Sequence, residues 1–296
     1  MQYEITHITN YEYGANAALC QNRAHLVLRD VFGQACKSCE LQVTPTPSET
    51  SRSCDFFGNP VDYFAIFKKH RRLSITAVSV VDVNKPVVPK ASLTPSWKSV
   101  RDELEIRRDT AWIDASQYVH GSPHVPPLDE LHDYAIPSFA AERPVLAGAA
   151  ELCQRIFNDF TFDPVATDVQ TPLETVFKKK RGVCQDLAHV QIGCLRSLGI
   201  PARYVSGYLR TAPPPGQQRL VGADASHAWL SVFCGDFGWV DLDPTNNMLP
   251  RNDHITVAWG RDYFDVRPVN GIFIGGGQHQ LNVSVDVAPV EEHSVG

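Results

Sequence analysis

One cysteine stands where a nucleophile could be activated. Cys184 follows the turn Arg181-Gly182 and precedes QDLAHVQIGCLRSLG, whose apolar periodicity predicts a buried helix from Cys184 to Gly199. The thiolate is the reactive form of cysteine, and a helix N-terminus or nearby cations lower the pKa of a thiol. A first-turn N–H is also unpaired and could hold an oxyanion. Cys184 is therefore either a nucleophile or, as is more common for cysteines at helix starts, an inert thiol.

A nucleophilic cysteine needs a base, and the base needs an orienting group. The segment SHAWLSVFCGDFGWVDLDPT, residues 226–245, predicts a β-hairpin with a three-residue loop at 234–236. In that register His227 lies opposite Asp243, and opposed side chains are about 4.5–5.5 Å apart at Cβ. An imidazole and a carboxylate can then form a hydrogen bond. Asp241 is the alternative orienting group if the register differs.

The other thiols have simpler interpretations. A chain with eight cysteines and no export signal favours free thiols over disulfides. Cys153 and Cys194 lie on apolar helix faces and are expected to fill the core. Cys36 and Cys39 form a lone C-x-x-C, and a structural zinc site would need a second pair of ligands at suitable spacing. Two reduced thiols are the favoured interpretation, with a zinc-dependent role as the weaker alternative.

Composition excludes several classes of partner. The chain has 296 residues, 43% of them hydrophobic, and a formal net charge of −6, so no basic surface for nucleic acid is expected. No apolar run approaches the roughly 20 residues of a membrane span. The N-terminal MQYEITHITNYEYG lacks the charged and apolar regions of a signal peptide. We therefore expect a cytoplasmic protein without a membrane or nucleic-acid partner; its oligomeric state is left open.

The elements that must position these residues fall into three segments. Residues 1–85 alternate in β fashion between Gly, Pro, Asn and Asp turns, which predicts an antiparallel, sandwich-like β domain. Residues 86–125 begin with the Pro-rich NKPVVPKASLTPS and are expected to be a linker and an irregular segment. Residues 126–296 combine helices, including one at 171–182 with a capping box, and strands that end in a closing strand. The fold class is α+β.

Four stretches carry a resemblance to a known family. RGVCQDLAH, LGIPARYVSGYL, SHAWLSVF and GWVDLDPTNN resemble the transglutaminase-like superfamily, in particular its bacterial cysteine-protease-like branch. Cys184, His227 and Asp243 match the family's G-x-C, H-x-W and D-P-T positions. The N-terminal H-x-T-x-Y-x-Y and D-x-x-G-N (Asp55–Asn59) resemble the β domain that precedes the core in this branch. The resemblance covers nearly the whole chain and implies a papain-like core with a Cys-His-Asp triad.

The resemblance also implies a reaction. Cys184 would attack an amide carbonyl and form a thioester, and water or an amine would release the acyl group. Hydrolysis of a peptide or isopeptide-like amide is favoured, because the branch is protease-like; transamidation and a non-catalytic binding module are the alternatives. No cofactor is expected, and no D-x-D-x-D-G calcium loop is present. Asp186, Tyr208 and Trp229 are weaker candidates for substrate contact, and a second oxyanion donor is unassigned.

Overall fold

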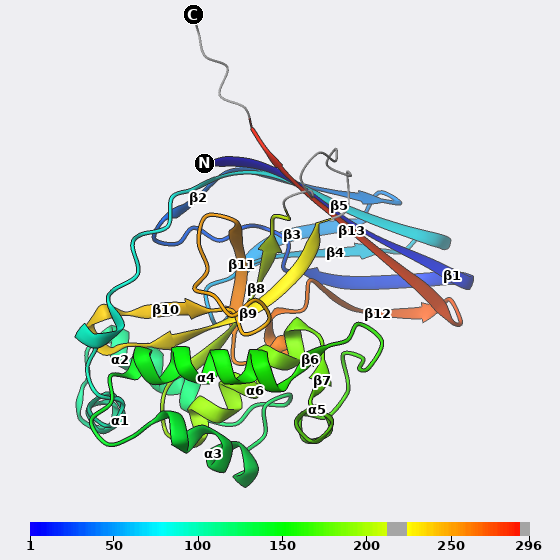
Figure 1. The fold of residues 1–296 in the computed structure, drawn as a ribbon. Helices are drawn as coiled ribbons and strands as arrows, with labels where there is room; N and C mark the ends of the chain where they lie inside the picture. Colours follow the sequence, from blue (N-terminus) through cyan, green and yellow to red (C-terminus); the bar gives the residue numbers. More distant parts are fainter. Residues whose placement is uncertain (212–223, 291–296) are drawn as a thin grey trace, which may run out of the picture.

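The computed structural model describes residues 1–211 and 224–290, which form an antiparallel β-sheet packed on a mixed α/β core (Figure 1). The expected α+β class, with an N-terminal antiparallel β part and a helix packed on a core sheet, is confirmed. Within the described residues no helix is long and apolar enough to span a membrane.

The N-terminal sheet is organised around one long strand, β1 (Gln2–Ala24). Along one edge β1 pairs first with β5 and then with β4, which are consecutive in the chain. Along the other edge it pairs with β13 and then β12. β2 and β3 lie outside β5 and β4. The bounds are β2 Gln34–Thr44, β3 Glu49–Cys54, β4 Pro60–Ile66, β5 His70–Val83, β12 Val269–Gly275 and β13 His279–Pro289.

This sheet bends back on itself. The pairing of β1 with β5 shifts in register between Glu12 and Ala17. On the other edge of β1, β12 ends and β13 begins opposite nearly the same residues, and Gly275 to Gly277 lie where the two strands connect. These three glycines have φ of 86°, 77° and 65°, a left-handed backbone that side chains disfavour. Figure 1 shows the chain reversing between β12 and β13. An apolar cluster draws on β1, β4 and β5 at both sides of the bend: Tyr13, Ala17, Cys20, Ala24, Phe64, Ile66, Leu73, Ile75 and Ala77.

The structure thus builds the predicted sandwich-like arrangement from a single seven-stranded sheet. It also corrects the predicted division of the chain, because β12 and β13 pair with β1 and not with the core sheet of segment 126–296. The alternating tail of the sequence correctly predicted a closing strand, which is β13. Alternation does not specify which sheet a strand joins, and here the partner lies more than 240 residues away in sequence.

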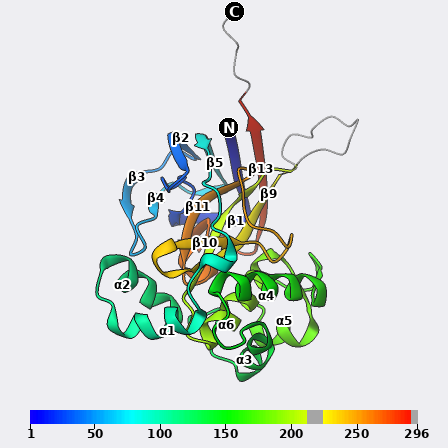
Figure 2. The same cartoon turned by 60° about the vertical axis from the view of Figure 1, so that its left-hand side comes forward.

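The core is a four-stranded antiparallel sheet with helices on one side (Figure 2). Its strand order is β10-β9-β8-β11, and α6 packs on β8 and β9 with α3, α4 and α5 around it. The strands are β8 Ala202–Leu209, β9 Ala225–Phe233, β10 Trp239–Leu242 and β11 His254–Gly260. The helices are α3 Asp129–Ala135, α4 Val145–Asp159, α5 Leu173–Lys179 and α6 Cys184–Ser197.

Helix α6 is the central element of the core. It begins at Cys184, as predicted, and every residue from 186 to 196 is buried. The chain leaves it through Gly199, whose φ is 76°. The helix before it is shorter than the predicted 171–182: α5 ends at Lys179, and Lys180 adopts the left-handed conformation. Residues 181–182 instead form β7, which pairs in parallel with β6 (Thr161–Phe162) and fixes the approach of the chain to Cys184.

The predicted irregular segment 86–125 holds two helices that the sequence analysis missed. Helix α1 (Trp97–Ile106) is capped by Ser96, whose side chain accepts the N–H of Ser99, and α2 spans Thr110–Ser116. Trp97, Val100 and Trp112 pack in the main core. The many charged residues between these few apolar positions concealed the helical periodicity.

The two parts of the molecule meet at β11, the edge strand of the core sheet. Two amide side chains from the N-terminal part pair with its free edge as a neighbouring strand would. Gln34 exchanges two hydrogen bonds with the backbone of Thr256, at 2.7 and 2.8 Å. Asn59 does the same with Trp259, at 2.8 and 3.0 Å. The free edge of β11 is therefore satisfied without a fifth strand.

The D-x-x-G-N motif supplies this contact. Asp55 accepts hydrogen bonds from the backbone and the amide of Asn59 and from the backbone of Phe57. Arg29 donates to the Asn59 amide oxygen at 2.6 Å and stacks 3.6 Å from the ring of Trp259. The motif is thus a structural connection between the two parts of the chain.

We expect Asn59→Ala to lower the free energy of unfolding by about 3 kcal/mol, because it leaves buried donors and acceptors of Trp259, Arg29 and Asp55 without partners. Urea denaturation measures the change. Asn10→Ala, at an exposed position of β1, is the matched control and should change the free energy of unfolding by less than about 0.5 kcal/mol. Equal effects of the two substitutions would contradict this role.

Candidate active site

Cys184 is the first residue of α6 and is partly exposed. The Asp186 side chain turns back over the preceding residues and accepts the N–H of Val183 at 2.8 Å and the hydroxyl of Thr167 at 2.6 Å. Burial raises the pKa of Asp186, although both hydrogen bonds oppose the shift. A Cβ on Gly182 would lie 2.5 Å from the Asp186 carboxylate, which explains the glycine two residues before the cysteine. Asp186, a candidate for substrate contact, is therefore placed as the cap of α6.

The hairpin that carries His227 and Asp243 has a different register from the predicted one. Phe233 pairs with Trp239, so the loop spans residues 234–238 and contains a short 3-10 turn, in place of the predicted loop at 234–236. Gly235 and Gly238 have positive φ and allow this longer loop. The shift is two residues on β10, which preserves the face of each side chain. His227 Nε2 and Asp243 Oδ2 still lie 2.7 Å apart.

Asp243 is a fully buried carboxylate surrounded by donors. Its Oδ2 accepts from His227, from His254 at 3.1 Å and from the Asn246 amide at 2.7 Å. Its Oδ1 accepts the backbone N–H groups of Thr245 at 2.9 Å and Asn246 at 3.2 Å. Burial acts to raise the pKa of Asp243, but these hydrogen bonds and the charge of His227 outweigh it and hold the pKa well below the usual range. Asp243 is therefore ionised.

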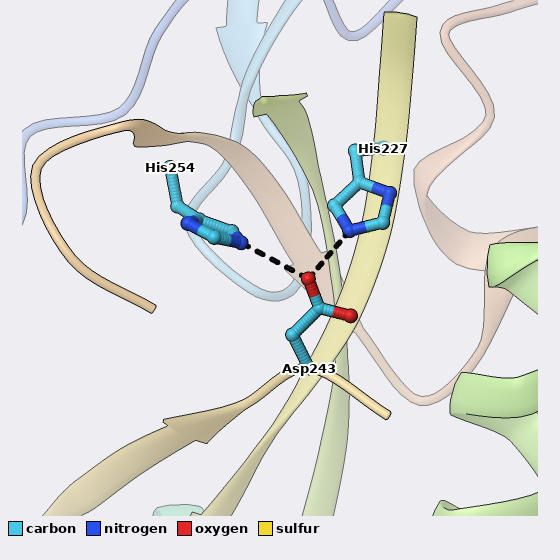
Figure 3. A group of neighbouring side chains, drawn as sticks. All are labelled: His227, Asp243 and His254. Atoms are coloured by element: carbon cyan, nitrogen blue, oxygen red, sulfur yellow. Dashed lines mark hydrogen bonds and ion pairs between the residues drawn. The ribbon is translucent and has the colours of Figure 1, made fainter. Parts of the chain in front are cut away.

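An ionised carboxylate only accepts hydrogen bonds, so His227 must donate from Nε2 and keep Nδ1 as its basic nitrogen. Nδ1 points away from Asp243 (Figure 3). Burial acts to lower the pKa of His227, but hydrogen bonding and charge from Asp243 and Cys184 outweigh it and raise the pKa to about 9. The structure thus brings Cys184, His227 and Asp243 into one group of interacting side chains.

Sequence reasoning missed two residues of this group. Asn246 lies three residues after Asp243, and the turn residues P-T-N-N could have indicated an amide folding back on the carboxylate. His254 begins β11, and its ring is fully buried. No local pattern pointed to it, because β11 joins the sheet beside β8 and reaches Asp243 only through the tertiary fold.

The remaining candidates are buried. Trp229 is fully buried, with its ring perpendicular to that of His254 at 5.3 Å. Tyr208 is 3% exposed and shares a 2.9 Å hydrogen bond with His7 of β1. Both residues pack in the interior. Their contact with substrate stays a prediction, because both side chains are almost completely shielded from solvent. Asp241, the alternative orienting group, pairs with Ser231 and Lys85.

The side chains grouped at Asp243 are of types that can bind a metal ion. His227, Asp243 and His254 offer ligand atoms that all lie within 4.8 Å of one another. However, both imidazoles are directed at the same carboxylate oxygen (Figure 3). The Asn246 amide donates to that oxygen as well, so hydrogen bonds occupy the position of an ion. Across residues 1–211 and 224–290, this is the only such group found, and it does not include Cys36 or Cys39.

The other thiols differ from Cys184 in their surroundings. Burial raises the pKa of Cys153, Cys194 and Cys234 to about 12 in each case. These thiols are inert at neutral pH. All eight cysteines are free, and Cys54 is the one that is exposed to solvent.

Comparisons with known proteins agree on the family. A model of the transglutaminase-like superfamily matches residues 134–244, and a model of the bacterial transglutaminase-like N-terminal region matches residues 3–82. An uncharacterized protein of Mycobacterium tuberculosis is 38% identical over 301 residues, which cover 98% of this chain and 93% of the relative. A protein-glutamine gamma-glutamyltransferase of Pseudomonas aeruginosa is 31% identical over 161 residues, 53% of this chain and 23% of the relative.

A solved structure has the same fold over most of the chain. It is described as a candidate cysteine protease from Cytophaga hutchinsonii and superposes with a TM-score of 0.75 at 20% identity, covering 98% of this chain and 91% of the other. At this identity the likeness concerns the fold alone.

The pKa of His227 predicts how stability depends on pH. Because the native pKa is raised from 6.5 to about 9, the protonated ring stabilises the fold fully below pH 6.5, and this contribution is lost as the pH rises through 9. We expect the free energy of unfolding to fall by about 2 kcal/mol between pH 6.5 and 8.5. His227→Gln should remove most of this decrease in urea denaturation. A variant with the same decrease as the wild type would contradict the raised pKa.

Proposed function

The chain belongs to the transglutaminase-like superfamily, and from this premise we propose that it hydrolyses a peptide or isopeptide-like amide through a thioester on Cys184. Membership supports cysteine-based acyl transfer at a general level. The observation that carries the proposal is the 2.7 Å hydrogen bond between His227 and the buried Asp243, which leaves Nδ1 of His227 as a base next to Cys184. No cofactor takes part in the proposed reaction.

In the proposed first step, Nδ1 of His227 holds the proton taken from the Cys184 thiol, as the raised pKa of His227 favours, and the sulfur attacks the carbonyl carbon. The N–H of Cys184, at the first turn of α6, helps to hold the resulting oxyanion. The C–N bond then breaks, and the imidazolium gives its proton to the leaving amine. Water attacks the thioester with Nδ1 as base, which releases the acid and restores the thiol.

Asp243 supports both steps without exchanging a proton. Its depressed pKa keeps it ionised, and its hydrogen bond holds His227 in the tautomer whose Nδ1 is basic. The ionised carboxylate also stabilises the imidazolium that forms when His227 takes the proton from Cys184.

The acceptor distinguishes two candidate functions. If water is the acceptor, the enzyme is a protease or amidase. We favour this activity because the branch of the superfamily that the sequence resembles is protease-like. An amine gives a transamidase, and the similarity to a protein-glutamine gamma-glutamyltransferase over 161 residues favours that second candidate. The same three side chains serve both reactions, since only the second nucleophile changes.

We also propose a class of substrate and a cellular location for the reaction. The substrate is a peptide or protein amide, since the superfamily acts on proteins and peptides, and a net charge of −6 gives no basic surface for nucleic acid. A cytoplasmic location fits eight free thiols. A binding module without catalysis is the remaining alternative, and the ionised Asp243 paired with a basic His227 argues against it, because a binding role requires neither.

The proposal is tested with a glutamine- and lysine-containing peptide mixture, with and without dansylcadaverine as amine acceptor, followed by mass spectrometry. Hydrolysis appears as peptide cleavage or as conversion of glutamine to glutamate, and transamidation appears as attachment of the amine. We expect hydrolysis to exceed amine attachment. Products dominated by amine attachment would make the second candidate the function.

Substitution of the triad provides the matched controls. We expect Cys184→Ala to reduce turnover by about 10³-fold or more, and Asp243→Asn by about 10²- to 10⁴-fold, because the asparagine no longer fixes the basic tautomer of His227. Cys54→Ala, which removes an exposed thiol, should leave turnover unchanged. Full turnover in Cys184→Ala would refute the mechanism.

A further inference from the structure

His254 is a second imidazole on the carboxylate that orients His227. Its Nε2 lies 3.1 Å from Oδ2 of Asp243, the same oxygen that accepts from His227 (Figure 3). The ring is fully buried, stands perpendicular to Trp229 and is 5.9 Å from the ring of His227. It lies outside residues 134–244, which the superfamily model matches.

The protonation state of His254 follows from its contacts. Because Asp243 is ionised and only accepts, His254 must carry its proton on Nε2. Its Nδ1 is buried and has no hydrogen-bond partner among residues 1–211 and 224–290. His254 is therefore a second imidazole donor to a carboxylate that also accepts from His227.

We propose that His254 is a positioning residue that fixes Oδ2 of Asp243 and draws negative charge from it, thereby limiting how strongly Asp243 holds the proton of His227. A base that holds its proton too tightly is a poor acid for the leaving amine. The inference rests on the proposed function, in which His227 must both take and release a proton. Asn246 cannot replace His254, since it already donates to the same oxygen.

Other titratable groups face this cluster, and none substitutes for His254. Cys184 approaches His227 from α6 and raises its pKa. Cys153 on α4 lies near Asp243. Burial and, to a smaller extent, the negative charge of Asp243 raise the pKa of the Cys153 thiol to about 12, so this thiol stays neutral. Lys85 lies 5.6 Å from the ring of Trp229 but pairs with Asp241. His254 is thus the side chain whose substitution removes one hydrogen bond from Oδ2 of Asp243 and leaves these other charges in place.

The test measures the pKa of His227 directly by NMR titration of imidazole nitrogens, with assignment by His227→Gln. His254→Phe keeps the size of the ring and removes the donor, whereas His254→Gln can place an amide N–H near the position of Nε2. We expect the pKa of His227 to rise by about half a unit to one unit in His254→Phe and to stay close to the wild-type value in His254→Gln. A merely structural role would lower stability without moving this pKa.

A folded His254→Phe in which the pKa of His227 is unchanged or lowered would overturn the inference. If His254→Phe does not fold, the wild-type protein still decides: its His254 nitrogen signals must show that Nε2 carries a proton in hydrogen bond to Asp243, and an unprotonated Nε2 overturns the inference. The NMR readout needs no substrate. A shifted pKa in a protein that turns over no amide would therefore contradict the proposed function and leave the role of His254 intact.

Discussion

An ionised carboxylate without solvent exposure is stable only when hydrogen-bond donors surround it, and the organisation of this protein centres on that requirement at Asp243. Five donors meet it, and they come from three places: the hairpin strand with His227, the turn after β10 and the start of β11. The carboxylate in turn fixes which nitrogen of His227 is basic. The geometry of the candidate site therefore depends on the correct placement of three strands of one sheet.

The N-terminal β part contributes to this placement at a distance. Strand β11 carries His254 at its first residue, and its free edge is held by Gln34 and Asn59. A further contact joins β1 to β8 through His7 and Tyr208. The β part thus serves as the missing neighbour of an edge strand, which gives the D-x-x-G-N motif a physical reason. It also explains why β12 and β13 return to β1, since they complete the sheet that supports β11.

Local patterns in the sequence predicted much of the site. The apolar periodicity after Arg181-Gly182 placed Cys184 at the first residue of α6, and alternation along the hairpin placed His227 and Asp243 on one face. The hairpin register was wrong by two residues, because Gly235 and Gly238 permit a longer loop than the shortest one compatible with the sequence. His254 and the sheet that β12 joins could not be predicted, since both depend on which strands become neighbours across long sequence separations. The catalytic roles themselves remain predictions.

The proposed mechanism depends on the activation of Cys184 by His227. The most direct measurement is the rate of iodoacetamide labelling of each cysteine at pH 6 to 9, resolved by mass spectrometry, in wild type and His227→Ala. Cys54 is the internal reference, because it is exposed and Cys184 only partly so. If His227 activates Cys184, Cys184 reacts faster than Cys54 at pH 7, and His227→Ala removes the advantage. Labelling of Cys184 no faster than that of Cys54 in the wild type would contradict this activation and favour a structural cysteine in a binding module.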